Sequence, residues 1–152
     1  MRVHVIAVGR AKAGPERDLF QHYAARMAPP PALREVEERR PLPAPERTTR
    51  EGELLLAALP AGATAVVLDE RGRTLTSIEL ATRLAKWRDA GVADLAFIIG
   101  GADGHAEAVR GRADLLLSLG PMTWPHMLVR GMLTEQLFRA QSILANHPYH
   151  RE

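Results

Sequence analysis

Residues 64–101, TAVVLDERGRTLTSIELATRLAKWRDAGVADLAFIIGG, contain a complete strand–helix–strand pattern. Residues 65–68 and 95–99 are short, uninterrupted apolar runs, which are typical of strands buried on both faces of a parallel sheet. Between them, residues 76–79 have the spacing of a capping box, which predicts the start of a helix, and Gly91 predicts its end. Because strands that alternate with helices build parallel sheets, we predict an α/β fold with a mainly parallel sheet flanked by helices.

The sequence on both sides of this segment continues the alternation. Apolar residues at helical spacing predict helices, and the charged composition of residues 33–40 indicates a strand at the edge of the sheet. Before residue 64 we expect a strand at 3–8, a helix at 15–27, the edge strand and a helix at 46–59; after residue 101 we expect a buried strand at 115–117 and a long helix at 126–145. A length of 152 residues suits one domain, so we expect residues 1–152 to form a single domain.

The composition excludes several classes of protein. The chain has no cysteine, which rules out disulfides, thiolate nucleophiles and cysteine-ligated metals. Its apolar runs are too short to cross a membrane and its first residues do not have the pattern of a signal peptide, so we expect a cytoplasmic protein with no membrane partner. No carboxylate cluster accompanies His147 and His150, so we predict no metal site. The net charge of +2 permits RNA binding without requiring it.

Three segments are candidates for ligand binding, because parallel sheets bind ligands in the loops beyond the carboxyl ends of their strands. They are residues 69–73, 100–105 and 119–125. The glycine loop, residues 100–104, lacks the glycine at position 99 that a dinucleotide fingerprint needs, and it lacks the Gly-Lys-Ser/Thr ending of a phosphate-binding loop. It is therefore either a tight turn or a loop that lets a ligand approach the backbone closely.

Residues 119–125, LGPMTWP, combine a glycine with two prolines and apolar side chains. The prolines restrict the backbone, so its amides and carbonyls can be held ready to bind an adenine ring. The same segment could instead be a connector, with Pro125 in the first turn of the last helix. In that helix, Glu135 and Arg139 have the spacing of an ordinary surface ion pair, and the broad apolar face suggests contact with a second subunit.

The C-terminal heptapeptide, residues 146–152, has the sequence NHPYHRE. It concentrates imidazole, phenol and guanidinium groups, which could stack on a base, grip phosphate and help to move a proton. Together with the motifs AVG at 7–9, LD at 68–69, IGG at 99–101 followed by Gly104, and residues 119–130, it makes the chain similar to the ribosomal RNA large-subunit methyltransferase H family of SPOUT methyltransferases. The resemblance covers almost the whole chain, and the heptapeptide is its most specific part. Ala102 and Asp103 stand where relatives often have Pro-Glu.

The resemblance implies a C-terminal trefoil knot, a homodimer, and S-adenosylmethionine as co-substrate. It also implies methylation of N3 of a pseudouridine in 23S ribosomal RNA, in the assembled ribosome. Carried over by position, the residues that bind the methyl donor are Leu68, Gly100, Gly101, Gly104, Leu119, Gly120, Pro121, Met122, Thr123, Trp124 and Pro125. Tyr149, His150 and Arg151 are then a substrate-side tail that completes the partner subunit's pocket.

The lack of cysteine fits transfer to nitrogen, because methylation at pyrimidine C5 commonly proceeds through a cysteine adduct. Transfer to nitrogen needs alignment of the methyl donor and removal of a proton. We hypothesise that Tyr149 or His150 orients the base and assists proton removal, while Arg151 and Arg139 contact the RNA. Two other functions fit the sequence: a different nucleotide-binding α/β enzyme, and a noncatalytic ribosome-associated RNA-binding factor.

Overall fold

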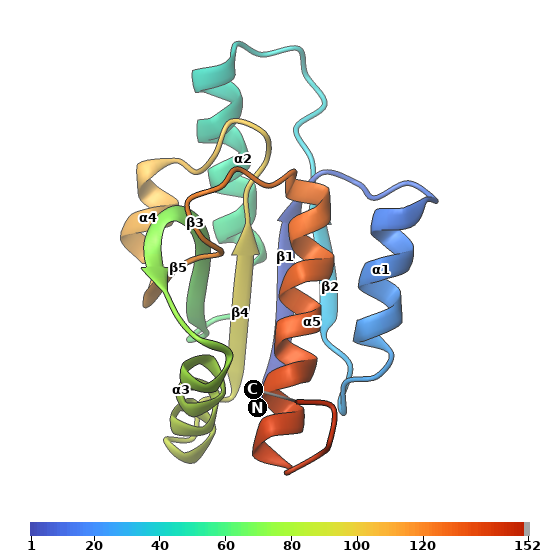
Figure 1. Ribbon diagram of the computed structural model, residues 1–152. Coiled ribbons are helices and arrows are strands. Elements are labelled where there is room, and N and C mark those ends of the chain that lie inside the picture. The colour runs from blue at the N-terminus through green and yellow to red at the C-terminus, as the bar shows by residue number, and fades with distance from the viewer. Residues whose placement is uncertain (151–152) are drawn as a thin grey trace.

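The computed structural model describes residues 1–150, which are built around a five-stranded sheet whose neighbouring strands are all parallel (Figure 1). The strands lie in the order β2-β1-β4-β3-β5. Their bounds are Arg2–Val8 for β1, Ala32–Val36 for β2, Thr64–Thr74 for β3, Asp94–Ile99 for β4 and Leu115–Ser118 for β5. The predicted α/β fold with a parallel sheet is confirmed.

Helices cover both faces of this sheet. Their bounds are Pro15–Ala24 for α1, Ala44–Ala58 for α2, Ser77–Asp89 for α3, Glu107–Arg112 for α4 and His126–Leu144 for α5. Side chains of α1, α3 and α5 share one buried cluster with Phe97 of β4, whereas those of α2 and α4 share another with Ile98. Because successive residues of a strand point to opposite faces, the continuous apolar runs of the sequence supply both clusters.

The observed elements differ from the predicted ones at several boundaries. Helix α1 ends at Ala24 instead of residue 27, and β2 ends at Val36 instead of residue 40. The segment after β2 leaves the sheet, and there Glu38 accepts hydrogen bonds from Arg40 and Arg50. Helix α4 was not predicted, because it is six residues long and therefore too short to show helical periodicity.

Strand β3 contains a bulge that corrects the expectation of a free loop at residues 69–73. Leu68 and Arg73 both pair with Leu117 of β5, so the chain between them bulges out of the ladder and then rejoins it. A Cβ atom at Gly72 would lie 2.6 Å from the carbonyl carbon of Leu116, which only glycine avoids. The bulge places Asp69 and Glu70, but not residues 71–73, at the edge of a cavity.

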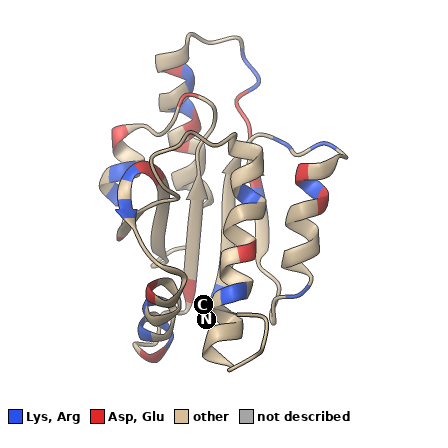
Figure 2. Ribbon diagram, in the orientation of Figure 1, with Lys and Arg blue, Asp and Glu red and all other residues tan. Residues whose placement is uncertain are grey.

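Helix α3 begins as predicted. Thr76 Oγ1 accepts a hydrogen bond from the Glu79 amide over 3.1 Å, and the Glu79 carboxylate accepts one from the Thr76 amide over 2.7 Å. These are the two reciprocal bonds of a capping box. Acidic and basic residues are interleaved along the helices and connecting segments (Figure 2).

Candidate functional site

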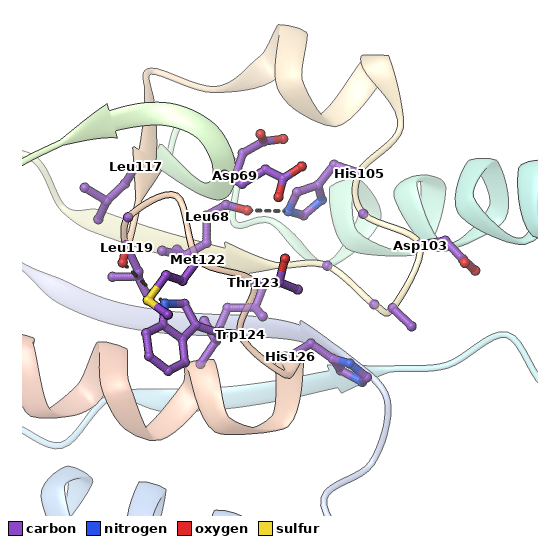
Figure 3. A pocket seen from close by; sticks show the side chains of 18 of the residues that line it. Leu68, Asp69, Asp103, His105, Leu117, Leu119, Met122, Thr123, Trp124 and His126 are labelled. Atoms are coloured by element: carbon purple, nitrogen blue, oxygen red, sulfur yellow. Dashed lines mark hydrogen bonds between the residues drawn. The ribbon is translucent and has the colours of Figure 1, made fainter.

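A cavity of about 370 Å³ lies at the carboxyl ends of β3, β4 and β5, where the sheet rule places ligands (Figure 3). Its walls come from the segments that follow the three strands and from the first turn of α5. All the predicted donor-binding residues line it except two: Leu68, Gly100, Gly101, Gly104, Leu119, Gly120, Met122, Thr123 and Trp124 are lining residues, whereas Pro121 and Pro125 are not. Pro125 is the N-cap residue of α5, one position before the first turn in which the connector interpretation placed it.

The loop at residues 119–124 gives the cavity an apolar wall. Met122 and Trp124 are exposed, with 70% and 39% of their surface accessible, and they face Leu119 in Figure 3. Ser118 Oγ accepts a hydrogen bond from the Gly120 amide over 3.1 Å, which holds the turn where Gly120 has a φ of +105°. Exposed apolar side chains beside a cavity are typical of a ligand-binding surface.

His105, the last residue of the segment 100–105, is a polar group of the cavity. Its ring Nε2 lies 3.0 Å from the carbonyl oxygen of Leu68. A carbonyl oxygen only accepts hydrogen bonds, so the proton is on Nε2 and, in the neutral ring, Nδ1 carries a lone pair. Nδ1 is buried without a partner. Burial lowers the pKa of His105, so the ring is neutral at pH 7 and offers an acceptor.

Asp69 and Arg110 fix the wall that follows β3. Arg110 Nε donates to Asp69 Oδ2 over 2.7 Å, and the Arg71 amide donates to Asp69 Oδ1 over 2.8 Å. Burial alone would raise the pKa of Asp69, but these hydrogen bonds outweigh it and lower that pKa. Sequence reasoning missed Arg110 because it belongs to α4, which was not predicted.

Arg130 anchors the start of α5 to the ends of β1 and β2. Its guanidinium donates to Glu35 Oε2 over 2.5 Å and to the carbonyl oxygens of Val8 and Gly9 over 3.0 and 2.8 Å. Only 1% of Arg130 is exposed. A single arginine thus satisfies carbonyl groups beyond β1 and fixes α5 beside the cavity. No sequence signal showed that this arginine is buried.

The structure separates the predicted substrate-side residues from the cavity of their own chain. Tyr149 donates to Glu135 Oε1 over 2.9 Å, and Arg139 donates to the same oxygen over 2.7 Å. The Tyr149 ring packs against Phe138, with 4.6 Å between ring centroids. Glu135 is midway along α5, whereas the cavity is lined by the start of this helix, at His126 and Val129. The helix between His126 and Glu135 spans about 14 Å.

The remaining residues of the heptapeptide are less connected. His150 is partly buried, and neither of its ring nitrogens has a hydrogen-bond partner. Arg151 lies outside the described residues. Residues 1–150 contain no group of three or more potential metal ligands, and none of their helices is long and apolar enough to span a membrane.

The arrangement of this chain matches a known family over its length. A family model described as "Predicted SPOUT methyltransferase" matches residues 1–150. The chain belongs to the SPOUT methyltransferase family. The trefoil knot expected for a SPOUT methyltransferase stays a prediction.

Relatives of this SPOUT chain include proteins called "Ribosomal RNA large subunit methyltransferase H" from Paramagnetospirillum magneticum and Rhodospirillum centenum. They are 64% and 61% identical, and in both the match covers 99% of each chain. A probable methylase family protein from Haemophilus influenzae has a TM-score of 0.56 at 8% identity, over 99% of this chain and 70% of that one. The SpoU methyltransferase AviRb from Streptomyces viridochromogenes, crystallised with AdoMet, has a TM-score of 0.51 at 14% identity, over 92% of this chain and 58% of that one. These two structures support the fold alone.

Proposed function

We propose that this protein is an S-adenosylmethionine-dependent methyltransferase that acts on large-subunit ribosomal RNA in the cytoplasm. Its finer target, on this proposal, is N3 of a pseudouridine in 23S ribosomal RNA within the assembled ribosome. The observation that carries the proposal is the cavity at the ends of β3, β4 and β5, formed by the glycine loop and residues 119–124. The names of the full-length relatives support the choice of reaction and of RNA.

The residues of the cavity fit this methyl donor. Its volume of about 370 Å³ lies in the range of small-molecule sites. Leu119, Met122 and Trp124 offer an apolar surface for an adenine ring, and the glycines let hydroxyl groups reach the backbone. The unpartnered Nδ1 of His105 is an acceptor suited to a hydroxyl or amino group of the donor. The donor supplies an electrophilic methyl group on sulfonium, and the protein aligns it with the acceptor nitrogen.

The separation of cavity and heptapeptide favours a homodimer. Because the Tyr149 hydroxyl is bound to Glu135, about 14 Å along α5 from the cavity, we expect Tyr149 and His150 to act at the donor site of a second copy. An apolar groove of about 690 Å³ between α1, α3 and α5 supports such contact, since Leu19, Leu80 and Met132 line it. Each tail would then grip the base at its partner's cavity.

Within the tail, Tyr149 orients the base and does not accept its proton. Burial, together with the nearby Glu135 carboxylate, raises the pKa of Tyr149 to about 12, so the phenol stays protonated at neutral pH. Its one proton is donated to Glu135 Oε1, so the phenol oxygen can accept a hydrogen bond from the base. His150, Arg139 and Arg151 complete the proposed contacts with the base and the RNA backbone.

The test compares 23S ribosomal RNA from a deletion strain with that from the parent strain. Loss of one methylated pseudouridine, restored by the purified protein on deficient ribosomes, is the expected result. Full methylation in the deletion strain would contradict the proposal and favour a noncatalytic ribosome-associated factor. Calorimetry with S-adenosylmethionine and with nucleotides separates this proposal from a different nucleotide-binding enzyme. Because the net charge is only +2, we expect ribosomes to be methylated more efficiently than naked RNA.

His150→Ala tests the role of the tail. His150 does not line the cavity of its own chain, so we expect methyl transfer to fall about 100-fold while the dissociation constant for S-adenosylmethionine stays unchanged. Single-turnover methylation and calorimetry measure the two quantities. Equal losses in both would exclude a substrate-side role.

A further inference from the structure

Glu51 is a buried carboxylate on α2 that lies against the glycine loop. Only 8% of its surface is exposed. A Cβ atom at Gly101 would lie 3.2 Å from Glu51 Oε1 and 3.1 Å from Val8 Cγ1. Glycine at position 101 therefore allows the loop to pack closely against this carboxylate. Glu51 was not among the residues that the sequence analysis singled out.

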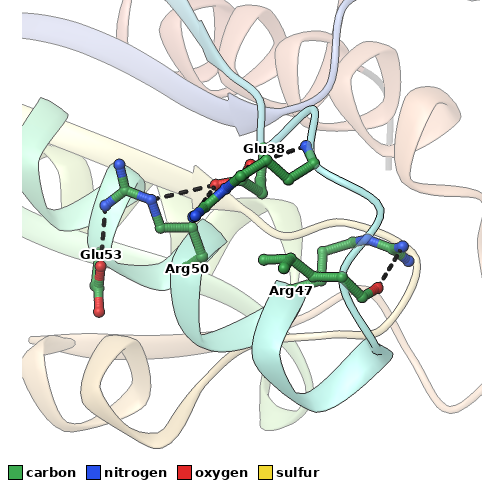
Figure 4. A network of polar contacts seen from close by, with 6 residues as sticks. Glu38, Arg47, Arg50 and Glu53 are labelled. Carbon is green, nitrogen blue, oxygen red and sulfur yellow. Dashed lines mark hydrogen bonds and ion pairs between the residues drawn. The ribbon is translucent and has the colours of Figure 1, made fainter.

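The Glu51 carboxylate has no hydrogen-bond partner among residues 1–150, because the arginines nearby are engaged elsewhere. Arg47 donates to the carbonyl oxygen of Leu42 over 2.7 Å and lies 3.8 Å from Asp103. Arg50 is bound to Glu38 and Glu53, as Figure 4 shows. The causes that shift the pKa of Glu51 include no hydrogen bond. This carboxylate therefore accepts no hydrogen bond within residues 1–150, and the charge of Arg47 only partly offsets its burial.

Such an arrangement costs stability. Burial raises the pKa of Glu51, and Asp103 and Glu38 raise it further, while Arg47 acts in the opposite direction. In the unfolded chain the same group ionises at its ordinary pKa, so its charge destabilises the fold above the raised pKa. Ionisable groups whose pKa is strongly shifted by burial and neighbouring charges are concentrated at functional sites.

The position of Glu51 relates it to the donor cavity. Gly101 lines that cavity and also contacts Glu51. Val8, at the end of β1, lies on the same side as Glu51, next to the end of β4. The donor cavity occupies the ends of β3, β4 and β5, so the neighbouring ends of β1 and β4 are where an acceptor base can approach the donated methyl group.

We propose that Glu51 is the general base that removes the N3 proton of the target pyrimidine, an inference that rests on the proposed function. The N–H bond breaks and its proton goes to the Glu51 carboxylate. The nitrogen electron pair forms the new bond to the methyl carbon, while the bond from that carbon to sulfur breaks and leaves its electrons on sulfur. Glu51 then returns the proton to solvent.

The other carboxylates near the strand ends suit this role less well. Asp69 is held by Arg110, and Glu35 by Arg130 and the Ala11 amide. Asp103 faces Arg47, and Glu70 is exposed to water. Glu51 is the buried carboxylate in this part of the described chain that has no donor bound to it, and a base works best when its own pKa approaches the operating pH.

Glu51→Gln tests the proposal, with Glu53→Gln as the matched control. Glu53 is on the same helix, but 60% of its side chain is exposed. We expect Glu51→Gln to lower the rate of methyl transfer to ribosomes about 100-fold or more. The dissociation constant for S-adenosylmethionine should change less than about threefold, because the amide has the shape of the carboxylate and does not line the donor cavity. Glu53→Gln should leave both quantities unchanged.

Two further measurements distinguish a catalytic role of Glu51 from a purely structural role in packing against the glycine loop. Because the charge of Glu51 destabilises the fold, Glu51→Gln should keep or raise Tm at neutral pH. The wild-type rate should rise with pH as Glu51 ionises, under the influence of Asp103, Glu38 and Arg47, and this rise should be absent in Glu51→Gln. Glu51→Asp should recover part of the rate.

The outcomes distinguish this inference from the proposed function. If the wild-type protein neither binds S-adenosylmethionine nor methylates deficient ribosomes, the proposed function fails. If the wild-type protein is active and Glu51→Gln is equally active, only the role of Glu51 fails. A matched loss of donor binding and rate in Glu51→Gln, with a lower Tm, would show that Glu51 supports the loop and would overturn its role as a base.

Discussion

The two ends of α5 differ in how their polar groups are satisfied. At the N-terminal end, beside the cavity, the buried Nδ1 of His105 has no hydrogen-bond partner and the Glu51 carboxylate accepts no hydrogen bond within residues 1–150. In the C-terminal half, which starts at Glu135, Tyr149 and Arg139 both bind Glu135, and Arg26 lies 4.3 Å from the centre of the Phe138 ring. The groups beside the cavity therefore keep free hydrogen-bonding capacity, whereas most polar groups of the C-terminal half are paired within their own chain.

This difference indicates how a small chain can hold both a donor site and a substrate site. Three loops of one subunit surround the cavity, so we expect it to bind the methyl donor without a contribution from a second subunit. The tail is held against α5 by Tyr149, but neither Tyr149 nor His150 lines the cavity of its own chain. A C₂ dimer would use that rigidity, since each tail could complete a site that its own chain cannot reach.

Mixed dimers test whether the tail of one subunit completes the cavity of the other, and they should give the largest change in activity. Gly100→Val should block the donor site, because a Cβ there would meet the His105 ring at 3.0 Å and the Gly104 carbonyl oxygen at 3.2 Å. His150→Ala should disable the tail. Each variant alone should be nearly inactive, but co-expression should restore about a quarter of wild-type activity, since half of the dimers would be mixed and each would have one intact site.

Methylation of deficient ribosomes measures that recovery. Both variants must first show a cooperative unfolding transition, so that a loss of activity is not a loss of folding. If co-expression restores no methylation activity, the cavity and the tail act within one chain. The difference between the two ends of α5 would then not reflect a site shared between subunits.

Two arginines of α5 provide the next test, which concerns stability. Arg130→Met would leave Glu35 without its cation and the carbonyl groups of Val8 and Gly9 without a donor. Breaking such a buried pair costs about 3–5 kcal/mol. Arg139→Met removes a partly exposed i,i+4 pair with Glu135, which contributes about 0.3–0.5 kcal/mol. Urea unfolding at one protein concentration measures both, and similar losses for the two variants would contradict the contrast.

The parts of the fold that the sequence predicted are those set by local patterns. Apolar runs identified β3 and β4, and the capping box identified the start of α3, because these signals need only neighbouring residues. The cavity was also placed correctly, since the loops after parallel strands converge at one edge of the sheet. The role of each lining residue in donor binding stays a prediction.

The features that the sequence did not predict depend on distant partners. Arg130 and Glu35 are 95 positions apart, and Arg110 and Asp69 are 41 apart, so no periodicity connects them. Glu51 looked like any charged residue of an amphipathic helix until the glycine loop was seen to cover it. The β3 bulge was equally hidden, because it depends on the close approach of Gly72 to the backbone of β5.

Tyr149→Phe tests the tail with the smallest effect. The substitution removes the hydrogen bond to Glu135 Oε1 but keeps the ring that packs against Phe138, so we expect a loss of about 1 kcal/mol in the free energy of unfolding. Donor binding should not change, because Tyr149 does not line the cavity of its own chain. A double-mutant cycle with Glu135→Gln isolates the bond from other effects of each substitution. If the effects of the two substitutions on the free energy of unfolding add without coupling, Glu135 does not hold the phenol in solution. The tail would then not be preorganised for the partner's site and would become ordered only when the RNA binds.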